Sequence, residues 1–224
     1  MSPIQQMLLG VGAVAKKTYL DDVFSTYVYS GSRNTNGSGS SDTINNGIDL
    51  AEEGGMIWLK GRDSQPYDYG NGIFDTVRGK TKNIQTQSDA AEATYPNAVS
   101  SFNSNGFTLN DGTYNWLNSN YASWTFRKAP GFFDVVTYTG TGSARTVAHS
   151  LGCVPGFIII KCRSDADQWE CFHDALGVTK RIRLESNDHA FDDGGSAWNN
   201  TAPTSTHFTV NSNNGVNGNG RTYV

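Results

Sequence analysis

The chain has 224 residues, which is enough for one large domain or two small ones, each with a core of its own. Only 17% of the residues are charged, whereas 12% are aromatic and 25 are glycine; this composition is poor in helix formers and excludes a helical bundle or a coiled coil. The formal net charge is −4 and the 17 basic residues are scattered, so we expect no nucleic-acid partner.

Residues 1–20 are predicted to be an anchoring peptide and linker. The apolar residues of this segment are Ile4, Met7, Leu8, Leu9, Val11 and Val14. Lys16 and Lys17 follow the apolar run, which is the wrong order for a secretory signal, and the run is too short to span a bilayer. We therefore expect these residues to dock on another protein without membrane insertion. The alternative is that they pack onto the chain's own first module.

The rest of the chain reads as one module used twice, over residues 21–132 and 133–224. Four pairs of segments match in the same order: 24–31 with 133–140, 55–63 with 156–164, 74–82 with 172–180, and 104–109 with 205–210. Several landmarks in one order at a nearly constant separation indicate a tandem duplication.

Each module is predicted to be an antiparallel β-sandwich, jelly-roll-like, so that the fold class is all-β with two tandem modules behind a short docking peptide. The signal is the recurrence of turn residues between short apolar or alternating runs, as in 43–50. Helix is expected only in the N-terminal peptide and in one turn at 87–92. Residues 31–41 and 211–220 are rich in glycine and asparagine, and we expect them to be flexible loops without a regular element.

The second module is expected to lack most of its last strand. In the first module this strand lies within 118–130, and the second module reaches the same point at 217–224, where only two or three strand residues remain. Trp124 is assigned to the core, at an apolar position that Tyr223 repeats. We expect the natural chain to continue beyond Val224; the alternative is that a partner completes the strand.

Three cysteines, Cys153, Cys162 and Cys171, are too few and too far apart for a disulfide framework or a C-x-x-C pair. We expect them to be small buried residues in strands of a protein that folds in a reducing cytoplasm.

No motif for catalysis or metal binding emerges, and we expect neither an enzyme nor a cofactor. The residue types of a catalytic triad are present, as His149, His173 and His207 with Ser150, Asp174 and Ser205, but nothing in the sequence brings them together. No G-x-S-x-G motif positions a nucleophile. The acidic group Asp188, Asp192 and Asp193 lacks the spacing of a calcium loop.

Exposed aromatic residues are the remaining candidates for a binding site. Trp116 and Tyr121 lie in a run rich in asparagine and serine, and Trp198 lies beside two asparagines. Aromatic rings stack on sugars while amides bond hydroxyl groups, so these three residues are candidate glycan contacts. Packing in the core is the competing interpretation for Trp116 and Trp198.

The sequence resembles a repeated module of structural proteins in tailed bacteriophages, especially marine and cyanobacterial ones. The segments that carry the resemblance are 4–10, 19–27, 54–60, 147–161, 169–180, 198–210 and 216–224. Such proteins are usually described as tail fibres, so the resemblance implies a homotrimeric virion protein, made in the host cytoplasm, whose N-terminal part docks on a tail adaptor or nozzle protein. It brings no catalytic or binding residues with it.

The leading hypothesis is therefore a tail fibre that is attached by residues 4–14 and whose two β-modules form a stalk toward the host surface. The first alternative is a lectin-like module that binds host surface polysaccharide through its aromatic residues. The second is a capsid decoration protein, which differs only in where the N-terminal peptide docks.

Overall fold

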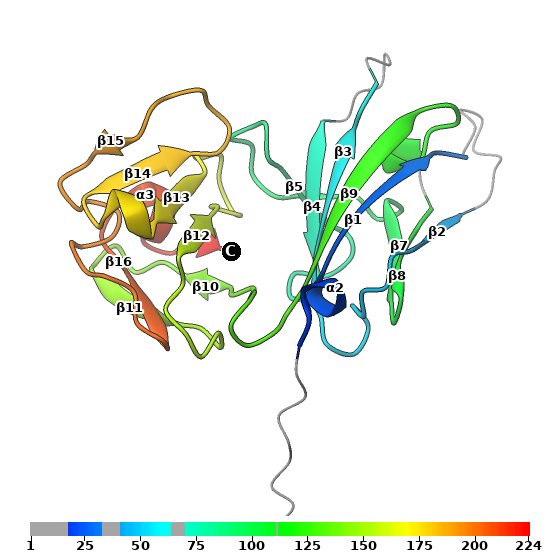
Figure 1. Ribbon diagram of the computed structural model, residues 1–224. Coiled ribbons are helices and arrows are strands. Elements are labelled where there is room, and N and C mark those ends of the chain that lie inside the picture. Colours follow the sequence, from blue (N-terminus) through cyan, green and yellow to red (C-terminus); the bar gives the residue numbers. More distant parts are fainter. Residues whose placement is uncertain (1–17, 33–40, 64–69, 111) are drawn as a thin grey trace, which may run out of the picture.

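The computed structural model describes residues 18–32, 41–63, 70–110 and 112–224. Two lobes of antiparallel strands lie side by side and are joined where the chain runs from β9 (Asn120–Arg127) to β10 (Tyr138–Thr139) (Figure 1). Among the described residues, the helices are four short turns: α2 (Leu20–Val23), η1 (Gly112–Tyr114), η2 (Asp174–Leu176) and α3 (Asn214–Asn217). The prediction of an all-β fold made of antiparallel sheets is confirmed.

The first lobe is a sandwich of two sheets. Its larger sheet has the order β1-β9-β3-β4-β5-β6, with β1 at Phe24–Ser30, β3 at Gly55–Gly61, β4 at Asn71–Asp75, β5 at Lys82–Gln85 and β6 at Ala93–Thr94. Its smaller sheet has the order β2-β8-β7, with β2 at Asp42–Asn45, β8 at Gly106–Leu109 and β7 at Val99–Asn103.

Strand β3 is covered on both of its faces, and this accounts for the four consecutive apolar residues 56–59. Ile57 and Leu59 are fully buried in the core between the two sheets, whereas Met56 and Trp58 face the other way, toward the second lobe. Alternate residues of a strand point to opposite faces of the sheet, so a run of four apolar residues covers both faces.

The second lobe repeats this order with shorter strands. One sheet has the order β12-β13-β14-β15, with β12 at Phe157–Ile160, β13 at Glu170–His173, β14 at Lys180–Arg183 and β15 at Phe191–Asp192. Two further pairs are β11 (Arg145–Ala148) with β16 (His207–Val210), and β10 with β17 (Thr222–Tyr223). A bridge between Cys162 and Tyr223 places β17 beside the end of β12. The resulting order, β10-β17-β12-β13-β14-β15, matches that of the first lobe.

A stacked tyrosine pair occurs at the same place in both lobes. The ring centroids of Tyr29 and Tyr121 are 5.1 Å apart, and those of Tyr138 and Tyr223 are also 5.1 Å apart. In the first pair Tyr29 donates a hydrogen bond to the Tyr114 carbonyl oxygen (2.9 Å), and Tyr138 donates the equivalent bond (2.6 Å) to the carbonyl of residue 216. Tyr223 therefore repeats Tyr121. The expected match with Trp124 is wrong by three residues.

A buried asparagine and a close glycine accompany each tyrosine pair. The Oδ1 atom of Asn115 accepts a hydrogen bond from the backbone N–H of Ser32 (3.0 Å), and that of Asn217 accepts one from the backbone N–H of Thr141 (2.9 Å). A Cβ atom on Gly31 or Gly140 would lie 2.2 Å from a backbone oxygen, so only glycine allows this approach. The asparagines and glycines thus stabilise the fold at these positions, although the sequence of the two segments is typical of loops.

Two local expectations are corrected. Residues 87–92 are irregular and contain no helical turn. Residues 211–220 contain α3, because the side chain of Asn213 accepts a hydrogen bond from the Gly215 N–H (2.8 Å) and so caps the turn. Most of the segment 31–41 lies outside the described residues.

Candidate functional site

The two lobes meet along a seam, which we define as residues 86–92 of the first lobe against 161–169 of the second. Backbone hydrogen bonds cross it from the Glu92 N–H to the Arg163 carbonyl (3.0 Å) and from the Asp167 N–H to the Asp89 carbonyl (2.9 Å). Interfaces between domains of one chain are usually mobile unless they are well packed. Backbone pairing fixes the two sides of this seam in one register.

Lys161 is the most deeply buried charged residue of the seam, with no exposed surface. Its ammonium group donates hydrogen bonds to the carbonyl oxygens of Asp89 (3.0 Å), Cys162 (3.0 Å) and Asp167 (2.8 Å). Burial lowers the pKa of Lys161 from its ordinary value, against the attraction of nearby acidic groups. Because one of the three carbonyls belongs to the first lobe, the ammonium group ties the lobes together.

Glu92 lies between one arginine from each lobe. Its carboxylate accepts two hydrogen bonds from Arg163 (2.9 and 3.0 Å) and one from Arg78 (3.1 Å). Burial alone would raise the pKa of Glu92, but the hydrogen bonds from Arg163 and Arg78 hold the pKa below its ordinary value. Bidentate pairing of arginine with a carboxylate fixes orientation as well as distance.

Trp169 extends the seam into an apolar cluster shared by both lobes. Its ring is 3% exposed and packs with Ile73 and Ile84 of the first lobe. The indole N–H lies within hydrogen-bonding distance of two first-lobe carbonyls, those of Gln85 (3.2 Å) and Ser88 (3.1 Å). The seam therefore combines apolar burial with directional bonds.

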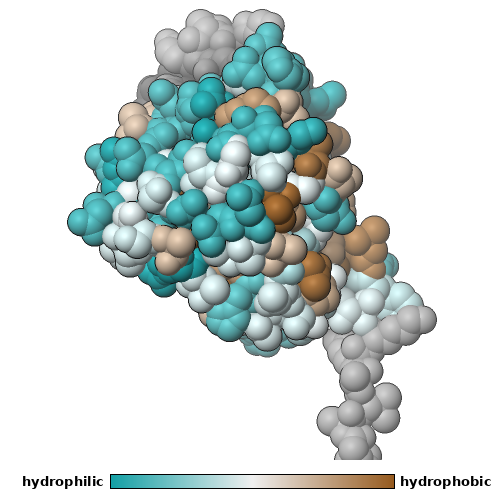
Figure 2. All heavy atoms as spheres, turned by 90° about the vertical axis from the view of Figure 1, so that its left-hand side faces the viewer, coloured by the Kyte–Doolittle hydropathy of each residue, from teal (hydrophilic) through white to brown (hydrophobic). Residues whose placement is uncertain are grey.

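Beside the seam lies a groove, a cavity of about 490 Å³ between the lobes. Its walls come from β3 and β4 of the first lobe, from the connecting segment 131–136 and from β12, and Val224 is also part of the lining. Two residues near it are unusually exposed for their type: Phe157 at 48% and Val154 at 58%. The outer face of the second lobe is mainly hydrophilic, with hydrophobic residues gathered toward one side of the view (Figure 2).

A comparison with protein families matches residues 21–224 to a domain of unknown function, DUF7483. The chain belongs to the DUF7483 family. The match spans both lobes, so the seam and the groove lie within the DUF7483 domain. No curated protein and no solved structure matches the chain.

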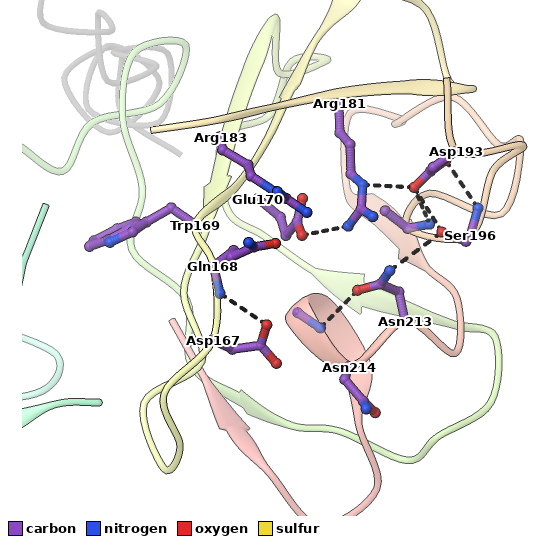
Figure 3. A network of polar contacts seen from close by, with 12 residues as sticks. Asp167, Gln168, Trp169, Glu170, Arg181, Arg183, Asp193, Ser196, Asn213 and Asn214 are labelled. Atoms are coloured by element: carbon purple, nitrogen blue, oxygen red, sulfur yellow. Dashed lines mark hydrogen bonds and ion pairs between the residues drawn. The ribbon is translucent and has the colours of Figure 1, made fainter. Parts of the chain in front are cut away.

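A second buried network lies inside the DUF7483 domain, in its second lobe (Figure 3). Glu170, which is 1% exposed, pairs with Arg181, and Arg181 Nε lies 3.1 Å from the Asp193 carboxylate. Asp193 also accepts a hydrogen bond from the Ser196 hydroxyl (2.8 Å), and the Asn213 amide lies 3.4 Å from that hydroxyl. The other oxygen of Glu170, Oε2, has no hydrogen-bond partner among the described residues. Burial raises the pKa of Glu170 to about 7.

The raised pKa of Glu170 predicts a pH-dependent stability. Because the folded state holds this proton more tightly than the unfolded state, the contribution is complete below pH 4.5 and is lost as the pH rises through about 7. We expect Glu170 to lower the free energy of unfolding by about 2–3 kcal/mol between pH 5 and pH 8. Urea unfolding at several pH values measures this. Glu170→Gln should flatten the dependence and Glu52→Gln, at an exposed position, should not; equal profiles for the three proteins would contradict the prediction.

The three candidate glycan contacts of the DUF7483 domain do not form one surface. Trp198 is 2% exposed inside the core of the second lobe, and Tyr121 is 4% exposed in the core of the first. The Tyr121 hydroxyl accepts a hydrogen bond from the Trp116 backbone N–H (3.1 Å), and Trp116 itself is half-buried. Neither Trp198 nor Tyr121 offers a ring face to a sugar, so both are corrected to core residues.

The histidines that were considered for a catalytic triad contact residues close to them. His149 contacts the backbone of Thr204 and Leu151, and His173 contacts Asp174. Within the described part of the chain no group of three or more His, Cys, Asp or Glu side chains could hold a metal ion. The cysteines are free, Cys162 and Cys171 buried and Cys153 exposed, which corrects the expectation for Cys153.

The predicted docking residues lie outside the described residues: Ile4, Met7, Leu8, Leu9, Val11 and Val14. No helix of the described part is long and apolar enough to cross a membrane.

Sequence reasoning missed the seam of the DUF7483 domain. Lys161 and Arg163 stand out in the sequence only as repeats of Lys60 and Arg62, and Lys60 is only half-buried. The only sequence signal for these seam residues was the repeat. The repeat shows that Lys60 and Lys161 are equivalent, but it does not show which of the two is buried against the other lobe.

Proposed function

We propose that this chain is a non-enzymatic structural protein of a bacteriophage virion, a tail fibre whose N-terminal residues attach to the tail and whose two lobes form a rigid stalk. The observation that carries the proposal is the seam. A stalk must hold its distal end at a fixed position, and the buried Lys161 ammonium group and the Arg163–Glu92 pair join the lobes so that they cannot hinge freely.

The resemblance to repeated modules of phage tail fibres supports the same proposal. From this resemblance we further propose that the protein is a homotrimer, that it docks on a tail adaptor or nozzle protein, and that its distal end contacts a host surface polysaccharide. Three N-terminal peptides that dock together would turn weak single contacts into lasting attachment, because the second and third contacts form at high effective concentration.

Deletion of residues 1–17 is the first test of this proposal. The deleted chain should keep the thermal midpoint and circular dichroism of the full chain, because both described cores lie in later residues. It should be absent from purified particles, whereas the full chain co-purifies with them. Mass spectrometry of the particles measures this.

A matched control keeps the length of the peptide and removes only its apolar character, by exchanging Leu8 and Leu9 for serine. This variant should be lost from particles as the deletion is, whereas exchange of Gln5 and Gln6 for serine should not matter. Incorporation of the deleted chain would overturn the anchor assignment. Gold-labelled antibodies that mark capsids instead of tails would replace the fibre with a capsid decoration protein.

A further inference from the structure

The buried network of the second lobe holds two carboxylates with a single arginine between them. The Arg181 guanidinium group pairs with Glu170 through Nη1, and its Nε atom lies 3.1 Å from the Asp193 carboxylate. The side chains of the two acids are only 2% and 5% exposed, so water cannot stabilise a second negative charge here. Charge balance therefore leaves one proton on this pair of acids.

The hydrogen-bond donors around the two acids decide which of them keeps the proton. Asp193 accepts bonds from the backbone N–H groups of residues 195–197 (2.9, 3.1 and 3.1 Å) and from the Ser196 hydroxyl (2.8 Å). Glu170 accepts one from Arg181, whereas its Oε2 atom has no hydrogen-bond partner in the described part of the chain. Donors stabilise a carboxylate as the anion. Glu170 is therefore the acid that holds the proton, in agreement with its raised pKa.

The other charged groups near Glu170 are paired elsewhere. Arg183 attracts the Glu170 carboxylate, but its guanidinium group lies 3.7 Å from the Asp188 carboxylate. Asp167 repels the Glu170 carboxylate and pairs with Arg221 (2.7 Å). Strand β12 places an isoleucine opposite Glu170, and the four residues of α3 are asparagine, glycine, valine and asparagine. Neither β12 at this position nor α3 therefore adds a charge.

The turn α3 covers Glu170, and it carries Asn214 beneath the network in Figure 3. A Cβ atom on Gly215 would lie 2.9 Å from both Cγ and Oε1 of Glu170, so the bare glycine backbone is in contact with the acid. A turn of four residues is not stable by itself and depends on the surface that it covers. A charge on Glu170 would make this cover costly, because a buried charge without a partner requires water.

The same turn also holds one edge of the second lobe. The carbonyl oxygen of Val216 accepts a hydrogen bond from the Tyr138 hydroxyl (2.6 Å). The side chain of Asn217 accepts one from the Thr141 N–H (2.9 Å) and donates one to the Ser143 carbonyl (2.7 Å). Displacement of α3 would therefore free this edge as well.

The first lobe has the equivalent turn, η1, without the acid. Gly72 and Asn83 stand at the positions of Glu170 and Arg181. A Cβ atom on Gly72 would lie 2.1 Å from the Tyr114 hydroxyl, so the Tyr114 side chain takes the space that the Glu170 side chain fills in the second lobe. The Asn83 amide lies 3.4 Å from the same hydroxyl. Neither an amide nor a phenol ionises near neutral pH, so this lobe lacks the response.

We propose that Glu170 is a proton switch: in its protonated form it keeps α3 on the second lobe, and in its ionised form it releases α3 and the edge that α3 holds. The strands of the lobe stay folded, because their own ladders and core hold them. The ordinary pKa of Glu170 is 4.5 and the raised one is about 7, so opening becomes about tenfold more favourable with each pH unit between these values and levels off above them. This inference does not depend on the virion role, since it rests on the buried network.

Hydrogen exchange of the full chain at pH 5, 6, 7 and 8 tests the switch, with each rate divided by the intrinsic rate at that pH. Protection at residues 215–218 and at Thr141 should fall by at least about tenfold between pH 5 and pH 7, and should change much less from pH 7 to pH 8. The equivalent residues of the first lobe, 113–115, should keep the same protection throughout and serve as the internal control.

Two variants assign the response to Glu170. Glu170→Gln keeps an acceptor for Arg181 but cannot ionise, so the protection of α3 should no longer depend on pH. Asp188→Asn removes an exposed carboxylate of the same lobe and should keep the fall seen in the original chain. If Glu170→Gln does not fold, the carboxyl ¹³C resonance of Glu170 in the original chain takes its place. This resonance should titrate with the same midpoint as the amide shifts of α3.

Four outcomes would overturn the proposal. The first is constant protection of α3 in the original chain, and the second is an equal fall in the Glu170→Gln protein. The third is an equal fall at residues 113–115 of the first lobe. The fourth is a fall of the same size in every strand of the second lobe, because ionisation would then weaken the lobe as a whole. In that case the predicted stability effect of Glu170 would hold without a switch at α3.

Discussion

Lys161→Met is expected to lower the free energy of unfolding by about 3–5 kcal/mol, because it leaves three buried carbonyl groups of the seam without their donor. Methionine keeps most of the volume of the lysine stem, so the loss reports the ammonium group more than a cavity. Urea unfolding measures the effect, and small-angle scattering should show a larger radius of gyration as the lobes separate.

The repeat supplies a matched control for this variant. Lys60 occupies the equivalent strand position in the first lobe and is only half-buried, so Lys60→Met should change the free energy of unfolding by less than about 1 kcal/mol. Equal losses for the two variants would mean that the lysine supports its own lobe in each case. The seam would then hold the lobes together by other contacts.

The strands could be predicted from the sequence because their signals are local. Alternation along 106–109 and the apolar run at 55–61 depend only on which residues point to which face. The matching landmarks indicated that the two modules share one strand order, but the order itself comes from the structure. The fully buried lysine could not be predicted, because burial of Lys161 depends on the other lobe.

The asparagine-rich segments misled the sequence analysis for a physical reason. Asparagine next to glycine and serine is typical of exposed loops, where amides meet water or sugars. Here Asn115 and Asn217 are fully buried, and their amides bond the backbone beside the glycine turns. Aromatic residues that flank such amides are then drawn into the core, as Tyr121 and Tyr223 are. Composition alone cannot separate a buried amide from an exposed one.

Trp198→Ala is expected to destabilise the second lobe by about 3–5 kcal/mol, the usual cost of removing a large buried aromatic side chain. The indole is 2% exposed, lies edge-on to Phe172 with centroids 5.8 Å apart, and donates a hydrogen bond to the Lys180 carbonyl (3.2 Å). The loss should appear as a lower urea midpoint, and as a separate early transition if the seam opens first.

Trp116→Ala is the matched control, since Trp116 was considered for the same role and is half-buried. It should cost less than half as much as Trp198→Ala, because less apolar surface leaves water when this ring packs. A Trp198→Ala protein that unfolds like the original chain but loses affinity on a glycan array would restore the sugar-contact hypothesis. A destabilised Trp198→Ala protein with an unchanged array would leave Trp198 as part of the core alone, which its burial requires.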